Sequence, residues 1–186
     1  MRVFKMKRAL PGAVMLGLCS CAHLPQSVGE ASMFYRDYVG PVDDPTAALV
    51  RISAYGAVRI TPGSECADFS KPETGVALFS SFSLKDYGHL HNRKLGVAGV
   101  APAGLVSTEI ALKANQAAVI SYTSNWTDRG MTYTCQVHRR FIPDAKTQYQ
   151  FTAQPIYADG QCQVQITRLD DPPLPIPMAV AGLCGS

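Results

Sequence analysis

Between Ala47 and Leu169, apolar and polar residues alternate in short runs, and this period-two pattern constrains the fold more than any other feature of the chain. Successive side chains of a β-strand point to opposite faces of a sheet, so the alternation predicts strands that each bury one face. Turn-forming residues separate the runs. The expected strands cover residues 49–53, 58–61, 76–82, 109–113, 117–122, 131–141, 147–153 and 161–169.

Strands without intervening helices favour an all-β domain in which two sheets pack face to face. We therefore expect an antiparallel β-sandwich of immunoglobulin-like or transthyretin-like type, with a small β-barrel as the alternative. The runs 49–53 and 58–61 flank a short turn and are predicted to pair as a β-hairpin. Five inward-facing positions are expected in the core: Ile52, Ile60, Val119, Phe151 and Val164.

The first 20 residues have the composition of an export signal. They hold four basic residues and no acidic one, followed by the apolar stretch Ala9–Leu18, which is too short to span a bilayer. Removing these four from the 17 Lys and Arg leaves 13 against 14 Asp and Glu, a formal charge of −1. That balance removes the electrostatic case for nucleic acid, which requires clustered basic residues.

The end of this segment, Leu18-Cys19-Ser20-Cys21, resembles the lipobox of bacterial lipoproteins. The resemblance implies that Cys21 receives the lipid. Cys19 is the competing acceptor, but it would place the bulky Leu18 where the motif requires a small residue. Ala22 after the cysteine implies attachment to the outer membrane, on its periplasmic face. Cleavage by an ordinary signal peptidase would instead give a soluble periplasmic protein.

The chain divides into a signal, a tether and one domain. A domain of this size with 47% hydrophobic and 17% charged residues can bury a core. Ser27 and Glu30 could cap one short helix that buries Phe34 and Tyr38, or the segment could be an extended lead-in held by those aromatics. The expected parts are residues 1–20 (signal peptide), 21–45 (tether) and 46–186 (a single β-sandwich domain).

Four cysteines remain once Cys19 is cleaved with the signal and Cys21 is lipidated, and an oxidising compartment favours two disulfides. In a simple meander, Cys135 and Cys162 lie two strands apart, about 9.6 Å, which exceeds the limit of about 7 Å for a disulfide. The sequence therefore favours Cys66–Cys135 with Cys162–Cys184, and leaves the crossed pairing open. The proline-rich segment 170–177 is expected to be a strap that returns Cys184 to the domain. The cysteines include no CxxC-type pair, the spacing that would indicate a zinc site.

Two loops carry the candidate binding residues. Trp126 and Arg129 lie in a seven-residue segment, 124–130, predicted to join two strands; an exposed Trp beside an Arg is a good binding anchor, and a Trp folded over the end of the sandwich is the alternative. His89 and His91 share one face of an extended segment and could chelate copper or zinc with a third ligand. His138 and Glu109 are expected on solvent-facing sides of their strands.

The sequence has no catalytic motif of the common hydrolase, zinc-protease or nucleotide-binding classes. The strand and turn pattern from Cys135 to Leu169 is similar to that of small β-sandwich lipoproteins of proteobacteria. This resemblance implies no catalytic residue and no cofactor. We expect a non-enzymatic envelope lipoprotein that contacts the membrane through its lipid and presents a structural or interaction surface to an envelope protein. A periplasmic metal or small-ligand binder using His89 and His91 is the alternative.

Overall fold

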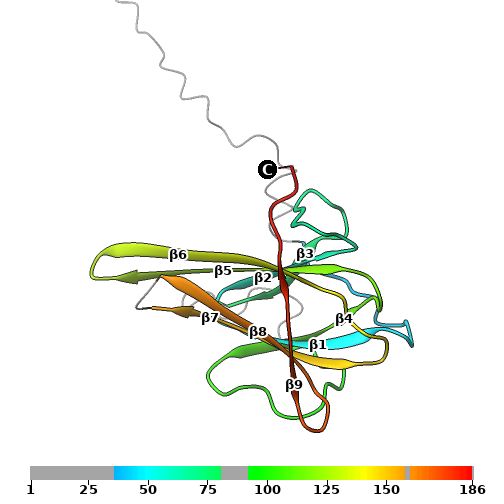
Figure 1. Ribbon diagram of the computed structural model, residues 1–186. Helices are drawn as coiled ribbons and strands as arrows, with labels where there is room; N and C mark the ends of the chain where they lie inside the picture. Colours follow the sequence, from blue (N-terminus) through cyan, green and yellow to red (C-terminus); the bar gives the residue numbers. More distant parts are fainter. Residues whose placement is uncertain (1–35, 81–91, 158–159, 186) are drawn as a thin grey trace, which may run out of the picture.

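The computed structural model describes residues 36–80, 92–157 and 160–185. Within these ranges the chain forms two five-stranded sheets and no helix (Figure 1). No described segment has the length and hydrophobicity of a membrane-spanning helix. The two sheets pack face to face and do not close into a barrel, so the prediction of an all-β sandwich is confirmed.

Each sheet contains strands from distant parts of the sequence. The first sheet has the order β4-β1-β7-β8-β9, made of Val106–Leu112, Ala48–Ala54, Gln148–Ile156, Gln161–Arg168 and Leu174–Ile176. The second has the order β10-β6-β5-β2-β3, made of Ala179–Val180, Met131–Phe141, Ala118–Asp128, Ala57–Pro62 and Gly75–Phe79. Neighbouring strands are antiparallel except β1 and β7, which are parallel. The sandwich is therefore built by repeated crossing between sheets rather than by a meander.

The predicted hairpin between residues 49–53 and 58–61 is wrong. Both runs are strands, but β1 belongs to the first sheet and β2 to the second. The chain crosses between the sheets at Gly56, whose φ of 127° lies outside the range that other residues favour. The alternation of apolar and polar residues indicates which face of a strand is buried. It does not indicate whether the next strand pairs with it in a hairpin or crosses to the other sheet.

The predicted core is correct for three residues and differs in detail for two. Ile52, Ile60 and Phe151 are buried between the sheets. Val164 is partly buried and packs against the same cluster. Val119 is fully buried but on the outer side of the second sheet, where Ala67 and Ala181 cover it. A loop and the C-terminal segment thus add a small second core outside the sandwich.

The chain joins the domain before β1. Residues 36–38 run beside β3, with backbone hydrogen bonds from Tyr38 N–H to Val76 O (2.9 Å) and from Val76 N–H to Arg36 O (2.7 Å). Tyr38 is buried, and its hydroxyl donates to Ala111 O at 3.1 Å. This aromatic therefore holds an extended lead-in against the sandwich, while Ser27, Glu30 and Phe34 lie outside the described residues.

The C-terminal segment is a strap across one side of the sandwich. It pairs with β8 as β9, crosses to the other sheet and pairs with β6 as β10. It ends at a disulfide between Cys184 and Cys66, whose Cα atoms are 5.1 Å apart, beside hydrogen bonds from Ala67 N–H to Gly182 O and from Cys184 N–H to Ala67 O. The expected return of Cys184 to the domain is confirmed.

The four cysteines in the described residues all form disulfides, but the predicted pairing is wrong. The bonds are Cys66–Cys184 and Cys135–Cys162, with a Cα separation of 5.5 Å in the second. The prediction assumed that β6, β7 and β8 are consecutive neighbours in one sheet. Instead the chain changes sheets after β6, so β6 and β8 face each other across the sandwich and their inward-facing cysteines meet.

Candidate functional site

One hairpin continues beyond the rest of the second sheet. β2 pairs with β5 only as far as Thr123, and β10 pairs with β6 only at Arg139 and Arg140. Between these limits β5 and β6 pair only with each other, in one unbroken register that ends at Asp128 opposite Met131. We call residues 124–137 the arm. It projects from the body of the sandwich, at the left of Figure 1.

A tight turn ends the arm. Arg129 and Gly130 occupy its two central positions, with φ angles of 49° and 79°. Two consecutive residues with positive φ are typical of the turn whose twist matches that of the flanking strands. The predicted seven-residue loop at 124–130 is therefore wrong. β5 extends through most of it, to Asp128, and its residues Asn125, Trp126 and Thr127 alternate in exposure as residues of a strand do.

An aromatic cluster lies on the inward side of the arm. The rings of Trp126 and Tyr133, which are directly opposite each other on β5 and β6, are stacked with centroids 5.5 Å apart and planes 14° apart. Tyr157, at the end of β7 in the other sheet, meets the Trp126 ring edge-on at 5.5 Å. Trp126 also packs against the main core. The cluster therefore links the arm to the opposite sheet through aromatic contacts.

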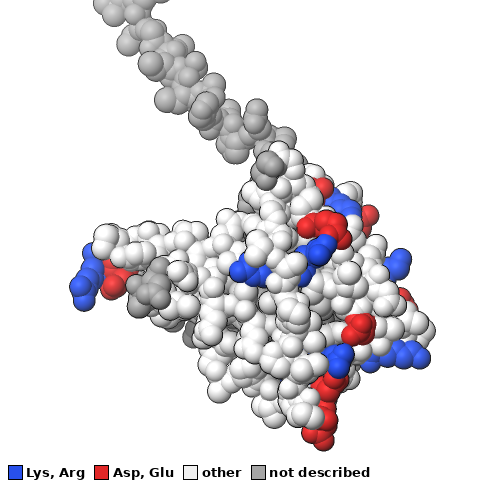
Figure 2. Space-filling model, in the orientation of Figure 1, with Lys and Arg blue, Asp and Glu red and all other residues white. Residues whose placement is uncertain are grey.

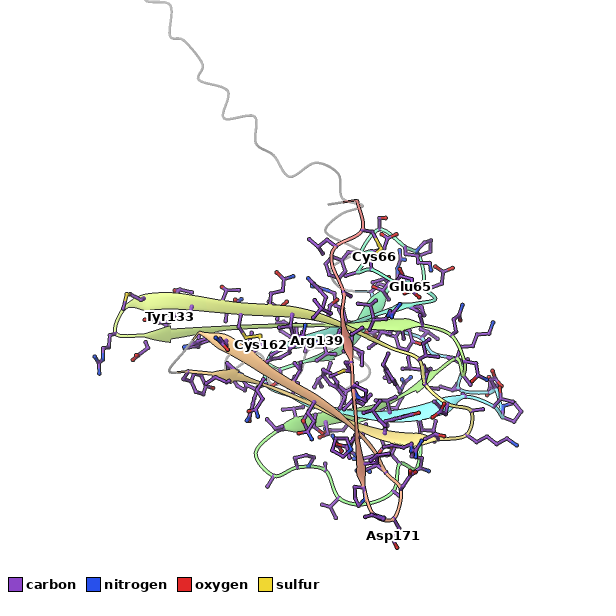
Figure 3. All side chains as sticks on the ribbon, in the orientation of Figure 1. Glu65, Cys66, Tyr133, Arg139, Cys162 and Asp171 are labelled. Atoms are coloured by element: carbon purple, nitrogen blue, oxygen red, sulfur yellow. A yellow bond between two sulfur atoms is a disulfide. The ribbon has the colours of Figure 1, made fainter. Side chains whose placement is uncertain are left out.

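The Cys135–Cys162 disulfide joins the base of the arm to β8 in the other sheet. Cys135 follows Tyr133 on the inward side of β6, and Cys162 lies near the start of β8. In Figure 3 Tyr133 lies farther out on the arm, and Cys162 lies below the arm closer to the body. The disulfide therefore limits how far the arm and the opposite sheet can separate.

The outward side of the arm is polar and carries no charged residue. Facing pairs along it are Thr123 with Gln136, Asn125 with Thr134, and Thr127 with Thr132. The arm's charged residues, Asp128 and Arg129, lie at its end, where Figure 2 shows one red and one blue group beyond a white stretch. Met131, next to the turn, is 57% exposed. Uncharged polar, aromatic and Met side chains are the composition expected of a protein-binding surface.

The structure separates the two residues predicted as one binding anchor. The Trp126 side chain lies on the inward side of the arm and is partly buried, which fits the alternative of a Trp folded over the end of the sandwich. Its indole Nε1 is buried without a hydrogen-bond partner among the described residues. Arg129 lies in the turn at the end of the arm. The two residues therefore belong to one projection but to different parts of it.

The other predicted sites fall outside the described residues: Cys21, His89 and His91. Among the residues that the structure does describe, no group of three His, Cys, Asp or Glu side chains is placed to hold a metal ion. His138 lies on the outward face of β6, as predicted, and its Nδ1 is 2.8 Å from Ser121 Oγ. Partial burial and then the charge of Arg139 lower the pKa of His138.

Glu109 is on the outer face of the first sheet, as its strand position predicts, but the expectation of solvent exposure is wrong. It is 1% exposed because residues 93–99 cover it. One carboxylate oxygen accepts hydrogen bonds from the backbone N–H groups of Leu95, Gly96 and Val97, at 2.6, 2.9 and 3.2 Å. The other accepts from Arg51 Nε at 3.2 Å.

Arg51 completes this buried network. Its guanidinium also donates to the backbone carbonyls of Val97, Ala98 and Gly99. Burial alone would raise the pKa of Glu109, but the hydrogen bonds from Leu95, Val97, Arg51 and Gly96 together lower it. The ion pair therefore holds the segment 93–99 against β1 and β4. No sequence pattern indicates this pair, because the covering segment has no alternation of its own.

Glutamines cover the open part of the same face. Gln154 and Gln163 face each other on β7 and β8, with Gln154 Nε2 3.2 Å from Gln163 Oε1. With Thr152, Gln165 and residues 102–105 they line a shallow hollow of about 360 Å³. The lining has no charged or aromatic group, so the hollow offers hydrogen bonds to a neutral ligand.

Comparison of the chain with protein-family models, with curated proteins and with solved structures finds no match. Inferences about its function consequently depend on its own residues and geometry.

Replacing Glu109 tests the buried ion pair. We expect Glu109→Gln to lower the free energy of unfolding at pH 7 by about 3–5 kcal/mol, because it leaves the buried Arg51 charge uncompensated. The pKa of Glu109 is lower in the folded state than in the unfolded chain, so its stabilisation is complete above the ordinary Glu pKa. It is lost as the pH falls through the folded-state value.

The difference between the wild type and Glu109→Gln should therefore shrink from pH 7 to pH 3, measured by urea unfolding. Glu73→Gln is the matched control, because Glu73 is exposed and should change stability by less than about 0.5 kcal/mol. A constant difference at both pH values would contradict the assigned role of the carboxylate.

Removing each disulfide separates its effect on stability from its effect on the arm. By chain entropy, the Cys135–Cys162 bond, which closes 27 residues, contributes about 3.5 kcal/mol, and the Cys66–Cys184 bond, which closes 118, about 5 kcal/mol. We expect Cys135→Ser with Cys162→Ser to move the emission of Trp126, the single Trp, to longer wavelength as the arm loosens.

Cys66→Ser with Cys184→Ser is the control and should leave the Trp126 emission unchanged while it costs at least as much stability. Equal shifts in the two double variants would show that the cluster responds to overall stability and not to the arm's own disulfide.

Proposed function

We propose that this chain is a non-enzymatic lipoprotein of the cell envelope, anchored through Cys21 to the periplasmic face of the outer membrane, whose arm binds another envelope protein. The lipobox-like sequence before Cys21 supports the anchor, and the two disulfides support export, because such bonds persist in oxidising compartments. The proposed interaction role is supported by the projecting arm.

The arm has the properties of a preorganised binding element. A hairpin with no neighbouring strands would ordinarily be only marginally stable. Here the disulfide at Cys135 and the ring contacts of Trp126 with Tyr133 and Tyr157 restrict it before any partner binds. Binding to a restricted element costs less conformational entropy, so more of the contact energy appears as affinity.

The charge distribution indicates what kind of contact the arm makes. Between the turn and Val137, its side chains offer hydroxyl, amide, aromatic and thioether groups and no charge. Recognition through such groups depends on hydrogen bonds and shape rather than on long-range attraction. We expect binding by the arm to change little with ionic strength.

A photo-crosslinking experiment in an exporting bacterium tests both parts of the proposal. A photoreactive amino acid replaces Met131 on the arm or, as a control, Val39, which is 81% exposed and lies next to the lead-in segment. We expect Met131, but not Val39, to give a discrete adduct with an identified envelope protein other than this chain, and substitution of the same residue in the purified pair to weaken binding at least tenfold.

The same chains carrying Cys21→Ser test the anchor. The expected result is loss of palmitate labelling and release from the membrane fraction. Cys19→Ser alone is the control and should be labelled and retained in the membrane fraction like the wild type. Labelling of Cys21→Ser would contradict the anchor, and equal adducts at Met131 and Val39 would contradict the arm as the binding element.

A further inference from the structure

The outer edge of β6 is open along the whole arm. β6 is paired with β5 on one side over all 11 residues, but on the other side β10 pairs only with Arg139 and Arg140. The last contact is the hydrogen bond from Ala181 N–H to His138 O at 3.1 Å. From Met131 to Val137, no described segment pairs with this edge.

Three other edges in the described part of the chain, those of β3, β4 and β9, are covered or unsuited to pairing. Residues 36–38 run beside β3. The backbone carbonyl of Arg93 accepts a hydrogen bond at 2.9 Å from the backbone N–H of Glu109 on β4. β9 is three residues long and contains Pro175, which has no N–H to donate. Short edges, prolines and covering segments are the ways in which proteins prevent edge-to-edge pairing.

The open edge of β6 has none of these protections. Its seven residues are Met-Thr-Tyr-Thr-Cys-Gln-Val, with no charged residue, Pro or Gly and no register shift against β5. Thr, Tyr and Val have high β propensity. In Figure 2 the corresponding surface is uncharged between the end of the arm and the C-terminal strap. Such an edge is a template for another strand.

We propose that this edge pairs antiparallel with the same edge of a second copy of the chain, about a twofold axis at Thr134. Antiparallel pairing of a strand with itself is the isologous contact that twofold symmetry requires. The inference rests on the edge alone and is independent of the lipid anchor and of any envelope partner.

The register follows from the two ends of the open stretch. The turn at Arg129 and Gly130 ends the strand on one side, and β10 blocks the edge beyond Val137 on the other. The stretch 131–137 is therefore paired in full only when Thr134 is its centre. This centre places Met131 opposite the copy's Val137, and Thr132 opposite the copy's Gln136.

These pairs match in chemistry as well as in length. Met131 is 57% exposed in the single chain, and Val137 lies on the same inward side of the arm, so the pair covers exposed apolar surface. Thr132, Thr134 and Gln136 lie on the outward side and pair polar with polar. No position sets like charges against each other, which would oppose self-association.

A second open edge lies on the same side of the sandwich. β9 pairs with β8 only from Ile166 onward, so residues 161–165 of β8 have no neighbour on that side among the described strands. They include three glutamines and no charge, and Cys162 joins them to β6 through Cys135. A copy docking along β6 thus meets an uncharged edge in each sheet.

The test compares two positions that face each other on the arm. Thr134 on β6 and Asn125 on β5 are paired and exposed on the same face, but only Thr134 lies on the proposed axis. Directly opposite residues of an antiparallel pair have Cα atoms about 4.5–5.5 Å apart, within the range of a disulfide. Under mild oxidation, we expect Thr134→Cys to crosslink the purified full chain into dimers and Asn125→Cys to remain monomeric.

Sedimentation velocity over a hundredfold concentration range gives the second measurement. The wild type should show a reversible dimer whose dissociation constant rises at least tenfold in Thr134→Lys, which sets two charges against each other at the axis, and less than twofold in Asn125→Lys. A wild type that is monomeric throughout, equal crosslinking at both positions, or crosslinking at residue 132 or 136 in preference to 134 would overturn the proposal. Circular dichroism checks that each variant is folded.

Discussion

The disulfide between Cys135 and Cys162 is the interaction that fixes the arm to the body of the sandwich. It joins β6 and β8, which lie in opposite sheets, on the side of the sandwich where both strands have open edges. The C-terminal strap closes the other part of that side by pairing with β8 and then with β6. Without the disulfide, the arm would be held to the first sheet mainly by the contacts of Trp126, whose indole N–H gains no hydrogen bond from the described residues. A long hairpin can project from a small domain and keep one conformation because its base is fixed covalently.

The two outer faces of the sandwich differ in what covers them. On the first sheet, the Arg51–Glu109 pair holds residues 93–99 over β1 and β4 through hydrogen bonds that satisfy both buried charges. On the second, the strap and the Cys66 loop bury Val119. The arm lies beyond both covers, so its uncharged outward face and the open edge of β6 stay accessible in the described structure. Burial of polar groups thus stabilises the body of the domain, and the surface suited to contacts is concentrated in one projection.

Much of the fold was predictable from alternation, because the solvent and the core select side chains independently of how strands connect. β6, β7 and β8 begin and end within three residues of the predicted runs. The pairing of strands was not predictable in the same way. Alternation is identical whether the next strand lies in the same sheet or the opposite one, so the hairpin of β1 with β2 and the distance between Cys135 and Cys162 were both inferred from a wrong connection. Glu109 shows a related limit, since a strand pattern identifies its face but not a loop that later covers it. Among the candidate binding residues, Trp126 was expected in a loop and lies instead in β5. Tyr133 and Tyr157 give no signal until the strands are paired.

Peptide mapping of the non-reduced protein tests most directly whether β6 and β8 face each other across the sandwich. Trypsin cuts after Lys and Arg and places the four cysteines in separate peptides, with Cys135 in residues 130–139 and Cys162 in residues 147–168. The structure predicts one crosslinked species that contains these two peptides and another that joins the peptides of Cys66 and Cys184. A peptide pair that joins Cys66 with Cys135, or Cys162 with Cys184, would contradict it, because the strands would then lie in a different arrangement and the arm would lack its covalent base.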